Sequence, residues 1–406
     1  MVIVIWQVLC ALLYRVAIHI SPMPVRHWVF YCDDKLKEDV LCMMDLNGYL
    51  KQIKALNTEA AAQAQVRLDS LAKPPGSLGE LESIAVKLAG INGQMIYDTA
   101  RRCVIIMASD NGVVEEGVAA APQGVTYAHI LNFGKGITGV NVLAKQFNAD
   151  LIVVDVGING DMSDPKVLNR KIRKSTHNIA KGAAMSREEA EKAVITGIET
   201  AIEAVKSGYT LLGAGEMGIG NTTTTAAVLC ALTGIKPEQA AGKGAGLSDE
   251  AYRNKINVIR TALDINKPNP EDALDVLAKV GGFDIAAMAG VFIGGAVMRV
   301  PVVIDGFISI AAALAAYRLN PLVKDFMFAS HASAEQGYIH AAGALGLKPC
   351  LQLNMRLGEG SGCPIMFSIM DAACAIIRDM GTFEQGNIDD EYLEAVKDED
   401  FHIRGL

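Results

Sequence analysis

Two glutamates beside closely spaced glycines could carry chemistry. Glu216 lies within GAGEMGIGNTTTTAA (213–227), and Glu359 lies within RLGEGSGCP (356–364). Glycine on both sides of Glu359 allows a ligand to approach the backbone closely. A partly buried carboxylate has a raised pKa and can act as a general base. Glu359 is therefore a candidate base, and an exposed loop glutamate is the alternative interpretation.

The glycines around Glu216 match two nucleotide-binding patterns incompletely. Residues 213–218 have G-x-G-x-x-G spacing, but no strand with an acidic end follows at the required distance. Residues 215–220 have P-loop spacing, but Asn221 stands where the lysine should be. A charge at Glu216 would also repel a pyrophosphate. An NAD-dependent oxidoreductase is therefore only a remote alternative.

A helix is expected to begin directly after these glycines. Its free N–H groups suit one monophosphate, and Asn221 and Thr222 could cap it. Glu216 could then accept hydrogen bonds from ribose hydroxyls or face a cationic ring. The alternative is a tight turn with a threonine-rich cap.

Two further segments carry polar residues where strands are expected to end. SDNGVVEEGVAAAPQGVT (109–126) is too long and too apolar for a hairpin loop, so we expect it to line a pocket, although Asp110–Gly112 could be a simple turn. In SHASAEQG (330–337), Ser333 could cap a helix or contact a phosphate. Nothing in the chain resembles the G-x-S-x-G elbow of a serine hydrolase.

The sequence predicts neither a metal site nor a cofactor. The seven histidines show no pairing at metal-ligand spacing. No Val/Ile-rich run ends in two acidic residues before a Thr-Gly loop, which a diphosphate-activated ribosyl donor would use to hold magnesium. If the protein handles ribose phosphate, a metal-independent mononucleotide is the expected donor.

The elements that must position these residues follow an alternating pattern. Apolar, β-rich runs alternate with helical segments, which predicts a doubly wound, mostly parallel sheet with helices on both faces. Two helices begin with capping boxes, Ser186 with Glu189 and Ser77 with Glu80. Small and acidic residues follow the runs, at the sheet edge where ligands bind. The predicted strands are 103–109, 150–158, 209–215, 300–306, 325–330 and 349–358.

Composition excludes several classes of protein. The chain has 406 residues and a net charge of −8, so it offers no basic surface for nucleic acid. Eight cysteines without a C-x-x-C pair indicate a reducing, cytoplasmic location. Residues 1–42 are apolar but interrupted by charge, and we interpret them as an over-extended start, with a membrane anchor as the alternative.

Seven stretches together resemble the nicotinate-nucleotide–dimethylbenzimidazole phosphoribosyltransferases of cobamide synthesis. They occur in that family's order and cover about residues 50–385. The matching stretches are KPPGSLGELE, SDNGVVEEGV, GAGEMGIGNTT, NKPNPEDALDVLAKVGGFDIAAMAG, PVVIDGFIS, SHASAEQG and RLGEGSG.

The resemblance implies a reaction. A lower-ligand base, such as 5,6-dimethylbenzimidazole, attacks C1′ of nicotinate mononucleotide, and nicotinate leaves with inversion from β to α. The product is an α-ribazole-type 5′-phosphate for cobalamin assembly. A purine or phenolic acceptor is the alternative. The donor's pyridinium is already a good leaving group, so neither metal nor cofactor is implied.

The resemblance also implies roles for individual residues. Glu359 is the general base. Ala121 and His129 stand where well-known benzimidazole-using members have serine and glutamine, which leaves the acceptor open; together with Asp110 they are assigned to the acceptor site. The residues assigned to nucleotide binding are Glu216, Gly218, Asn221, Thr222, Lys255, Ser333, Leu357, Gly358 and Gly360.

Family resemblance further predicts a homodimer and two domains. A small helical domain is expected from residues 43–95 and 365–406, and a Rossmann-like catalytic domain from 96–364. Relatives that use phenols pair with a sister subunit, so a hetero-oligomer is the alternative. Small-molecule substrates are the expected partners, with no nucleic acid and no membrane.

Overall fold

The computed structural model describes residues 44–244, 246–389 and 391. The chain divides into two compact units, 1–48 and 49–406, and all six described strands belong to the second. The interpretation of residues 1–42 as an over-extended start lies outside the described residues. No described helix is both long and apolar enough to cross a membrane.

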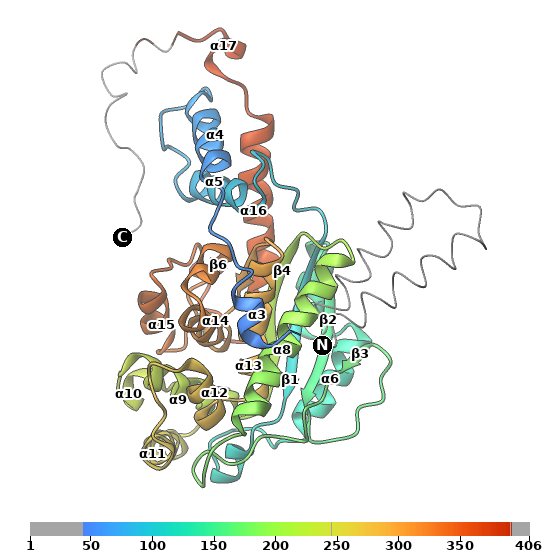
Figure 1. The fold of residues 1–406 in the computed structure, drawn as a ribbon, viewed down its shortest axis with the longest axis vertical. Helices are drawn as coiled ribbons and strands as arrows, with labels where there is room; N and C mark the ends of the chain where they lie inside the picture. The colour runs from blue at the N-terminus through green and yellow to red at the C-terminus, as the bar shows by residue number, and fades with distance from the viewer. Residues whose placement is uncertain (1–43, 245, 390, 392–406) are drawn as a thin grey trace, which may run out of the picture. The chain divides into compact units, whose positions relative to one another are not determined.

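A six-stranded parallel sheet forms the centre of this second unit, and the doubly wound prediction is confirmed (Figure 1). Its strand order is β3-β2-β1-β4-β5-β6, so the direction of winding reverses between β1 and β4. Ligands bind at such a reversal, beyond the carboxyl ends of the strands. The strands are β1 (Arg102–Ser109), β2 (Asp150–Gly157), β3 (Val167–Asn169), β4 (Leu211–Met217), β5 (Val302–Ile304) and β6 (Met327–Ala329).

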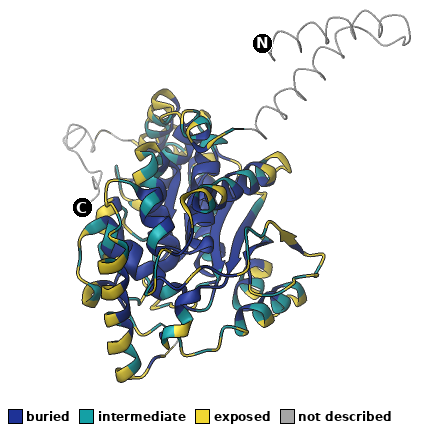
Figure 2. Ribbon diagram, turned by 60° about the horizontal axis from the view of Figure 1, so that its bottom comes forward, coloured by how far each residue is buried: buried dark blue, intermediate teal, exposed yellow. Residues whose placement is uncertain are grey.

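Helices cover both faces of the sheet. Helices α6 and α7 connect β1 to β2, whereas α13 precedes β5 and α14 connects β5 to β6 on the other side of the reversal. Right-handed crossovers therefore place the two pairs of helices on opposite faces of the sheet. Helix α16 contacts α7 and the central strands. Figure 2 shows the strands buried between these layers. The helices are α3 (Leu46–Leu50), α4 (Thr58–Asp69), α5 (Glu80–Asn92), α6 (Val125–Lys135), α7 (Gly139–Gln146), α8 (Arg187–Lys206), α9 (Asn221–Thr233), α10 (Pro237–Ala240), α11 (Asp249–Asn266), α12 (Ala273–Val280), α13 (Phe283–Val297), α14 (Phe307–Leu319), α15 (Tyr338–Leu345), α16 (Gly362–Asp379) and α17 (Phe383–Gly386), with 3₁₀ turns η1 (Gly112–Glu116) and η2 (Pro321–Phe326).

One predicted strand is wrong, and one observed strand was not predicted. Residues 349–358 form no strand and make only the isolated bridge His331–Leu351; the segment is largely exposed, and Asn354 has a left-handed backbone with φ of 53°. The short edge strand β3 was not predicted, because it has three residues and two of them are exposed.

One predicted capping box is confirmed and the other is wrong. Ser186 and Glu189 cap α8 reciprocally. Helix α5 begins after Gly79, which has a φ of 53°, and Ser77 makes no cap. Instead Glu82, in the first turn, accepts the N–H of Leu78 at 2.9 Å and pairs with Lys73, so it holds the chain that leads into the helix.

Close contact between α8 and α13 depends on glycine. Every residue from Phe283 to Ala296 is buried, so α13 is apolar on all sides. A Cβ on Gly197 of α8 would overlap the carbonyl oxygen of Ala287, and a Cβ on Gly290 of α13 would overlap that of Val194. The two helix backbones therefore touch at these glycines.

Gly197→Ala is expected to destabilise the protein by about 2–3 kcal/mol, because the backbones of α8 and α13 would have to separate within a packed core. Urea unfolding followed by circular dichroism measures the change. Gly343→Ala is the control: Gly343 lies exposed in α15, and a Cβ there meets no described atom within 4 Å. That change should stabilise by about 0.5–1 kcal/mol. Equal effects at the two sites would contradict the packing argument.

Helices α4 and α5 pack against each other and against α16 (Figure 1). They are the elements expected in the small helical domain. Helix α16 also contacts β1, β4 and β5, so the same helix belongs to both groups of contacts. The division into 43–95 with 365–406 and 96–364 remains a prediction.

Candidate active site

A cavity of about 270 Å³ lies at the carboxyl edge of the sheet. It is lined by residues that follow β1, β4, β5 and β6 and by the segment before α16. The structure brings eleven of the predicted site residues to this cavity: Ala121, His129, Glu216, Gly218, Asn221, Thr222, Lys255, Ser333, Leu357, Gly358 and Glu359.

Glu359 sits on an unusual piece of backbone. Gly358, Glu359 and Gly360 all have positive φ values, of 85°, 63° and 80°. A left-handed conformation is costly for a glutamate, and such strain persists where the surroundings hold it in place. The flanking glycines adopt it without that cost. This local geometry is what RLGEGSG encodes.

The Glu359 carboxylate is buried and held by two groups on the same face of the sheet. Its Oε2 accepts the N–H of Val140 at 3.0 Å, and its Oε1 lies 2.7 Å from Nε2 of His129. Val140 is in the first turn of α7, where free N–H groups stabilise an ionised acid. Both oxygens of the carboxylate are therefore fixed in direction by hydrogen bonds, as a positioned general base requires.

Asp305 holds the backbone of this loop. It follows β5, and its two carboxylate oxygens accept the N–H of Gly362 at 2.7 Å and of Gly360 at 3.1 Å. Burial raises the pKa of Asp305 to about 7. The loop that carries Glu359 is thus tied to the end of a central strand.

Glu216 stands at the end of β4, not within a loop. The predicted strand 209–215 is displaced by two residues, because β4 spans Leu211–Met217 and so includes Glu216. A Cβ on Gly215 would lie 2.7 Å from the carbonyl oxygen of Glu359. Glycine at this position therefore lets the Glu359 loop lie against the strand, which is a packing role and not a nucleotide contact.

A chain of buried polar groups connects Glu216 to the rest of the site. Its Oε1 accepts the N–H of Glu359 at 3.3 Å, and its Oε2 accepts from Nδ2 of Asn221, which also donates to Asp284 at 3.2 Å. Burial raises the pKa of Glu216, and it raises that of Asp284 to about 7. The predicted cap by Asn221 is wrong: Gly220 is the N-cap of α9, and the Asn221 side chain turns to these acids.

The start of α9 and a buried lysine form a second polar end of the cavity. Lys255 of α11 is fully buried, and its Nζ donates to Oγ1 of Thr222 at 2.9 Å and to the carbonyl of Gly242 at 3.0 Å. Burial lowers the pKa of Lys255 to about 8. Ser333 also lines this cavity. A cation, a hydroxyl and a helix N-terminus together suit a phosphate.

Part of the cavity lining is apolar. Val118, Ala119–Ala121 and Val125 line it, with Leu357 on the loop of the base and His129 beside it. A flat, apolar heterocycle fits such a lining, and His129 and Glu359 of the same cavity are two side chains that can hydrogen-bond to it. This is the chemistry expected of an acceptor pocket.

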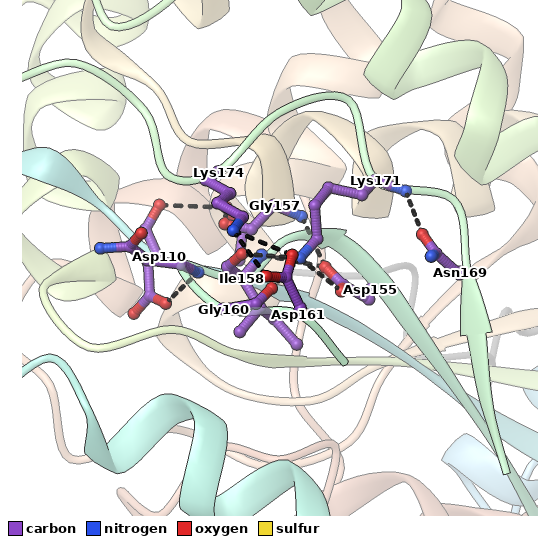
Figure 3. A network of polar contacts seen from close by, with 11 residues as sticks. Asp110, Asp155, Gly157, Ile158, Gly160, Asp161, Asn169, Lys171 and Lys174 are labelled. Atoms are coloured by element: carbon purple, nitrogen blue, oxygen red, sulfur yellow. Dashed lines mark hydrogen bonds and ion pairs between the residues drawn. The ribbon is translucent and has the colours of Figure 1, made fainter. Parts of the chain in front are cut away.

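The structure does not bring Asp110 and Gly360 to the cavity. Asp110 is buried, and its Oδ2 accepts the N–H of Asn159 at 2.7 Å. Figure 3 shows Asp110 in a network with the end of β2, in which Lys171 pairs with Asp155 at 3.1 Å. Asp110 therefore joins the end of β1 to the loop that follows β2. Gly360 faces Asp305 instead.

Sequence reasoning missed three residues near the base. Asp305 lies within the predicted strand 300–306 and Asp284 within one of the matching stretches, but neither was assigned to the site. His331 lines the cavity, and its Nδ1 lies 3.0 Å from Oγ of Ser330. Burial lowers the pKa of His331, which favours its neutral form. In the described part of the chain, no group of three His, Cys, Asp or Glu side chains is arranged to hold a metal ion.

Fold and cavity together define the class of protein: a doubly wound α/β enzyme. Comparison with known proteins narrows this class. A family model described as a phosphoribosyltransferase matches residues 53–388. The chain belongs to this phosphoribosyltransferase family.

Named relatives and solved structures agree with that placement. The nicotinate-nucleotide–dimethylbenzimidazole phosphoribosyltransferase of Clostridium perfringens (strain 13 / Type A) is 55% identical over 88% of this chain and 99% of its own. The enzyme of that name from Clostridium tetani is 49% identical over 88% and 99%. The crystal structure of CobT from Thermus thermophilus has a TM-score of 0.79 at 42% identity, covering 82% of this chain and 99% of that chain. The remote NAD-dependent alternative finds no support in these relatives.

Proposed function

We propose that this phosphoribosyltransferase moves the 5-phosphoribosyl group of nicotinate mononucleotide to 5,6-dimethylbenzimidazole or a closely related base. The proposal rests on one observation: a single cavity holds the ordered Glu359 carboxylate beside an apolar wall and the buried Lys255 at a helix start. The names of the relatives support these substrates, and they give no support to a phenolic or purine acceptor.

Each end of the cavity has a task in this reaction. Lys255, Thr222 and the N–H groups of α9 bind the donor phosphate. Glu216 accepts hydrogen bonds from the ribose or faces the pyridinium ring. The acceptor lies on the apolar wall formed by Ala121 and its neighbours, with its N–H directed at Glu359.

The chemical step exchanges one bond at C1′ for another. The acceptor's free ring nitrogen forms a bond to C1′, and the bond from C1′ to the pyridinium nitrogen breaks. The electron pair of that bond neutralises the pyridinium, and nicotinate leaves. The proton on the acceptor's other nitrogen passes to Glu359. Attack from the face opposite the leaving group inverts the configuration from β to α.

The protein's assembly and location follow from the same resemblance. We propose a homodimer, as in the family that the sequence resembles. We also propose a cytoplasmic location, because the described cysteines Cys103, Cys230, Cys350, Cys363 and Cys374 are free thiols.

The test is a metal-free assay. The protein is incubated with nicotinate mononucleotide and each of dimethylbenzimidazole, unsubstituted benzimidazole, adenine and phenol, and nicotinate is measured by chromatography. We expect release with the benzimidazoles and little with phenol. Absence of nicotinate with all four acceptors would refute the proposed function.

A further inference from the structure

His129 lies where it can control the charge on the proposed base. It is on α6, and its Nε2 is 2.7 Å from Oε1 of Glu359, while its side chain keeps 27% of its surface exposed. Glu359 is 7% exposed at its side chain. The imidazole therefore connects a buried carboxylate to the open part of the cavity.

The hydrogen bonds around Glu359 identify the group that titrates beside it. The other carboxylate oxygen of Glu359, Oε2, accepts the backbone N–H of Val140, which does not titrate. The ring of His129 is held edge-on against Phe133, with centroids 5.1 Å apart. The imidazole is thus the ionisable partner of Glu359 at hydrogen-bonding distance, and its orientation is fixed by packing.

We propose that His129 is a positioning residue with two states: neutral, it orients the Glu359 carboxylate for proton transfer, and protonated, it holds that carboxylate in an ion pair that suppresses the reaction. This inference rests on the proposed function, in which Glu359 accepts the acceptor's proton.

The physical reason is charge balance. While His129 is neutral, proton transfer from the acceptor converts an anion and a cationic intermediate into neutral groups. While His129 is protonated, the same transfer leaves a neutral acid beside an uncompensated imidazolium in a partly buried site, which is unfavourable. The imidazolium would also repel the donor's pyridinium ring. Both effects slow the reaction at low pH.

Neighbouring groups raise the pKa of His129 above that of an ordinary histidine, so the change of state occurs at a higher pH. The hydrogen bond that His129 makes to Glu359 is the main cause that raises the pKa of His129 above 6.5, with smaller electrostatic contributions from Glu359 and Glu216, and burial opposes them. Helix α6 itself carries Tyr127 and Lys135, and α7 carries Lys145. The other ionisable side chains that line the same cavity are Lys243, Lys255, Asp305, His331, Glu335 and Arg356.

The first experiment does not depend on the reaction. The full-length protein is labelled at histidine Cε1 and titrated by NMR, and His129→Gln assigns the signal. We expect His129 to titrate above 6.5 and its midpoint to fall in Glu359→Gln, because the anion that favours the imidazolium is gone. His177→Gln, which alters an exposed histidine outside the cavity, should leave the His129 titration unchanged. If the His129 midpoint is the same in Glu359→Gln as in the wild type, the proposed pairing of His129 with Glu359 is wrong.

The second experiment measures the pH profile of nicotinate release, each variant normalised to its own plateau. One pH unit below the His129 midpoint, the wild type should retain about a tenth of its plateau rate, as expected for a single ionisation. His129→Gln should retain more than about half, because glutamine can donate a similar hydrogen bond without titrating. A variant profile that matches the wild type overturns the switch. If no variant releases nicotinate, the proposed function fails, and the NMR result still decides the pairing.

Discussion

Replacing Glu359 with glutamine should lower kcat for nicotinate release by at least about 10²-fold, the usual contribution of a positioned general base. Glutamine has nearly the same shape, so its carbonyl can still accept from Val140 and its amide can still reach His129. Glu359→Gln therefore removes the negative charge of the carboxylate and leaves the side-chain packing unchanged. KM for nicotinate mononucleotide should therefore change by less than about threefold, since a base acts on the transition state and not on donor binding.

Steady-state kinetics with dimethylbenzimidazole give both constants, and a thermal melt confirms that the fold is intact. Glu203→Gln is the matched control, because Glu203 is an exposed carboxylate on α8 paired with Arg170. That variant should keep the wild-type kcat. Unchanged kcat in Glu359→Gln would mean that another group, or water, accepts the proton.

Replacing Lys255 with methionine should raise KM for nicotinate mononucleotide by about 10²-fold, which corresponds to roughly 3 kcal/mol. Lys255 is fully buried beside Thr222, so a phosphate there would meet an unscreened cation. Methionine fills a similar volume and carries no charge. kcat should fall much less, because the phosphate is bound equally in the ground and transition states.

The same lysine predicts a pH dependence of donor binding. The pKa of Lys255 in the free protein is lowered to about 8, so the cation is present below that pH and lost above it. KM of the wild type should therefore rise as the pH passes about 8, and KM of Lys255→Met should not. Lys279→Met, at the surface pair with Asp275, is the control and should reproduce the wild-type curve. A variant whose KM still rises above pH 8 would place the titrating group elsewhere.

Much of the fold could be predicted because its signals are local. The runs at β1 and β2 are continuous and apolar, and the α8 capping box lies within four residues. The segment at 349–358 shows the limit of this signal. Its alternating apolar residues resemble a strand, but strand formation needs a continuous partner, and residues 330–334 provide only scattered backbone bonds such as Ala332 to Leu351.

The site was predicted unevenly for a related reason. Glu359 was found because its flanking glycines are adjacent to it in the sequence. The glycines before Glu216 suggested a nucleotide loop. At Gly215, however, a side chain is excluded because the Glu359 loop, 144 residues further along the chain, lies against the strand. Asp305 likewise acts through N–H groups more than fifty residues distant. Nothing in a local pattern records such contacts.

The attachment of the Glu359 loop to Asp305 has a consequence for how the protein fails. Besides its own flanking glycines, the conformation of the base depends on Asp305 after β5 and on the first turn of α7. Detachment of α16 from the sheet would release the left-handed run at 358–360 and abolish turnover while most helices remained folded. Enzymatic activity should therefore be lost at lower denaturant concentrations than helical signal, as an early reporter of partial unfolding.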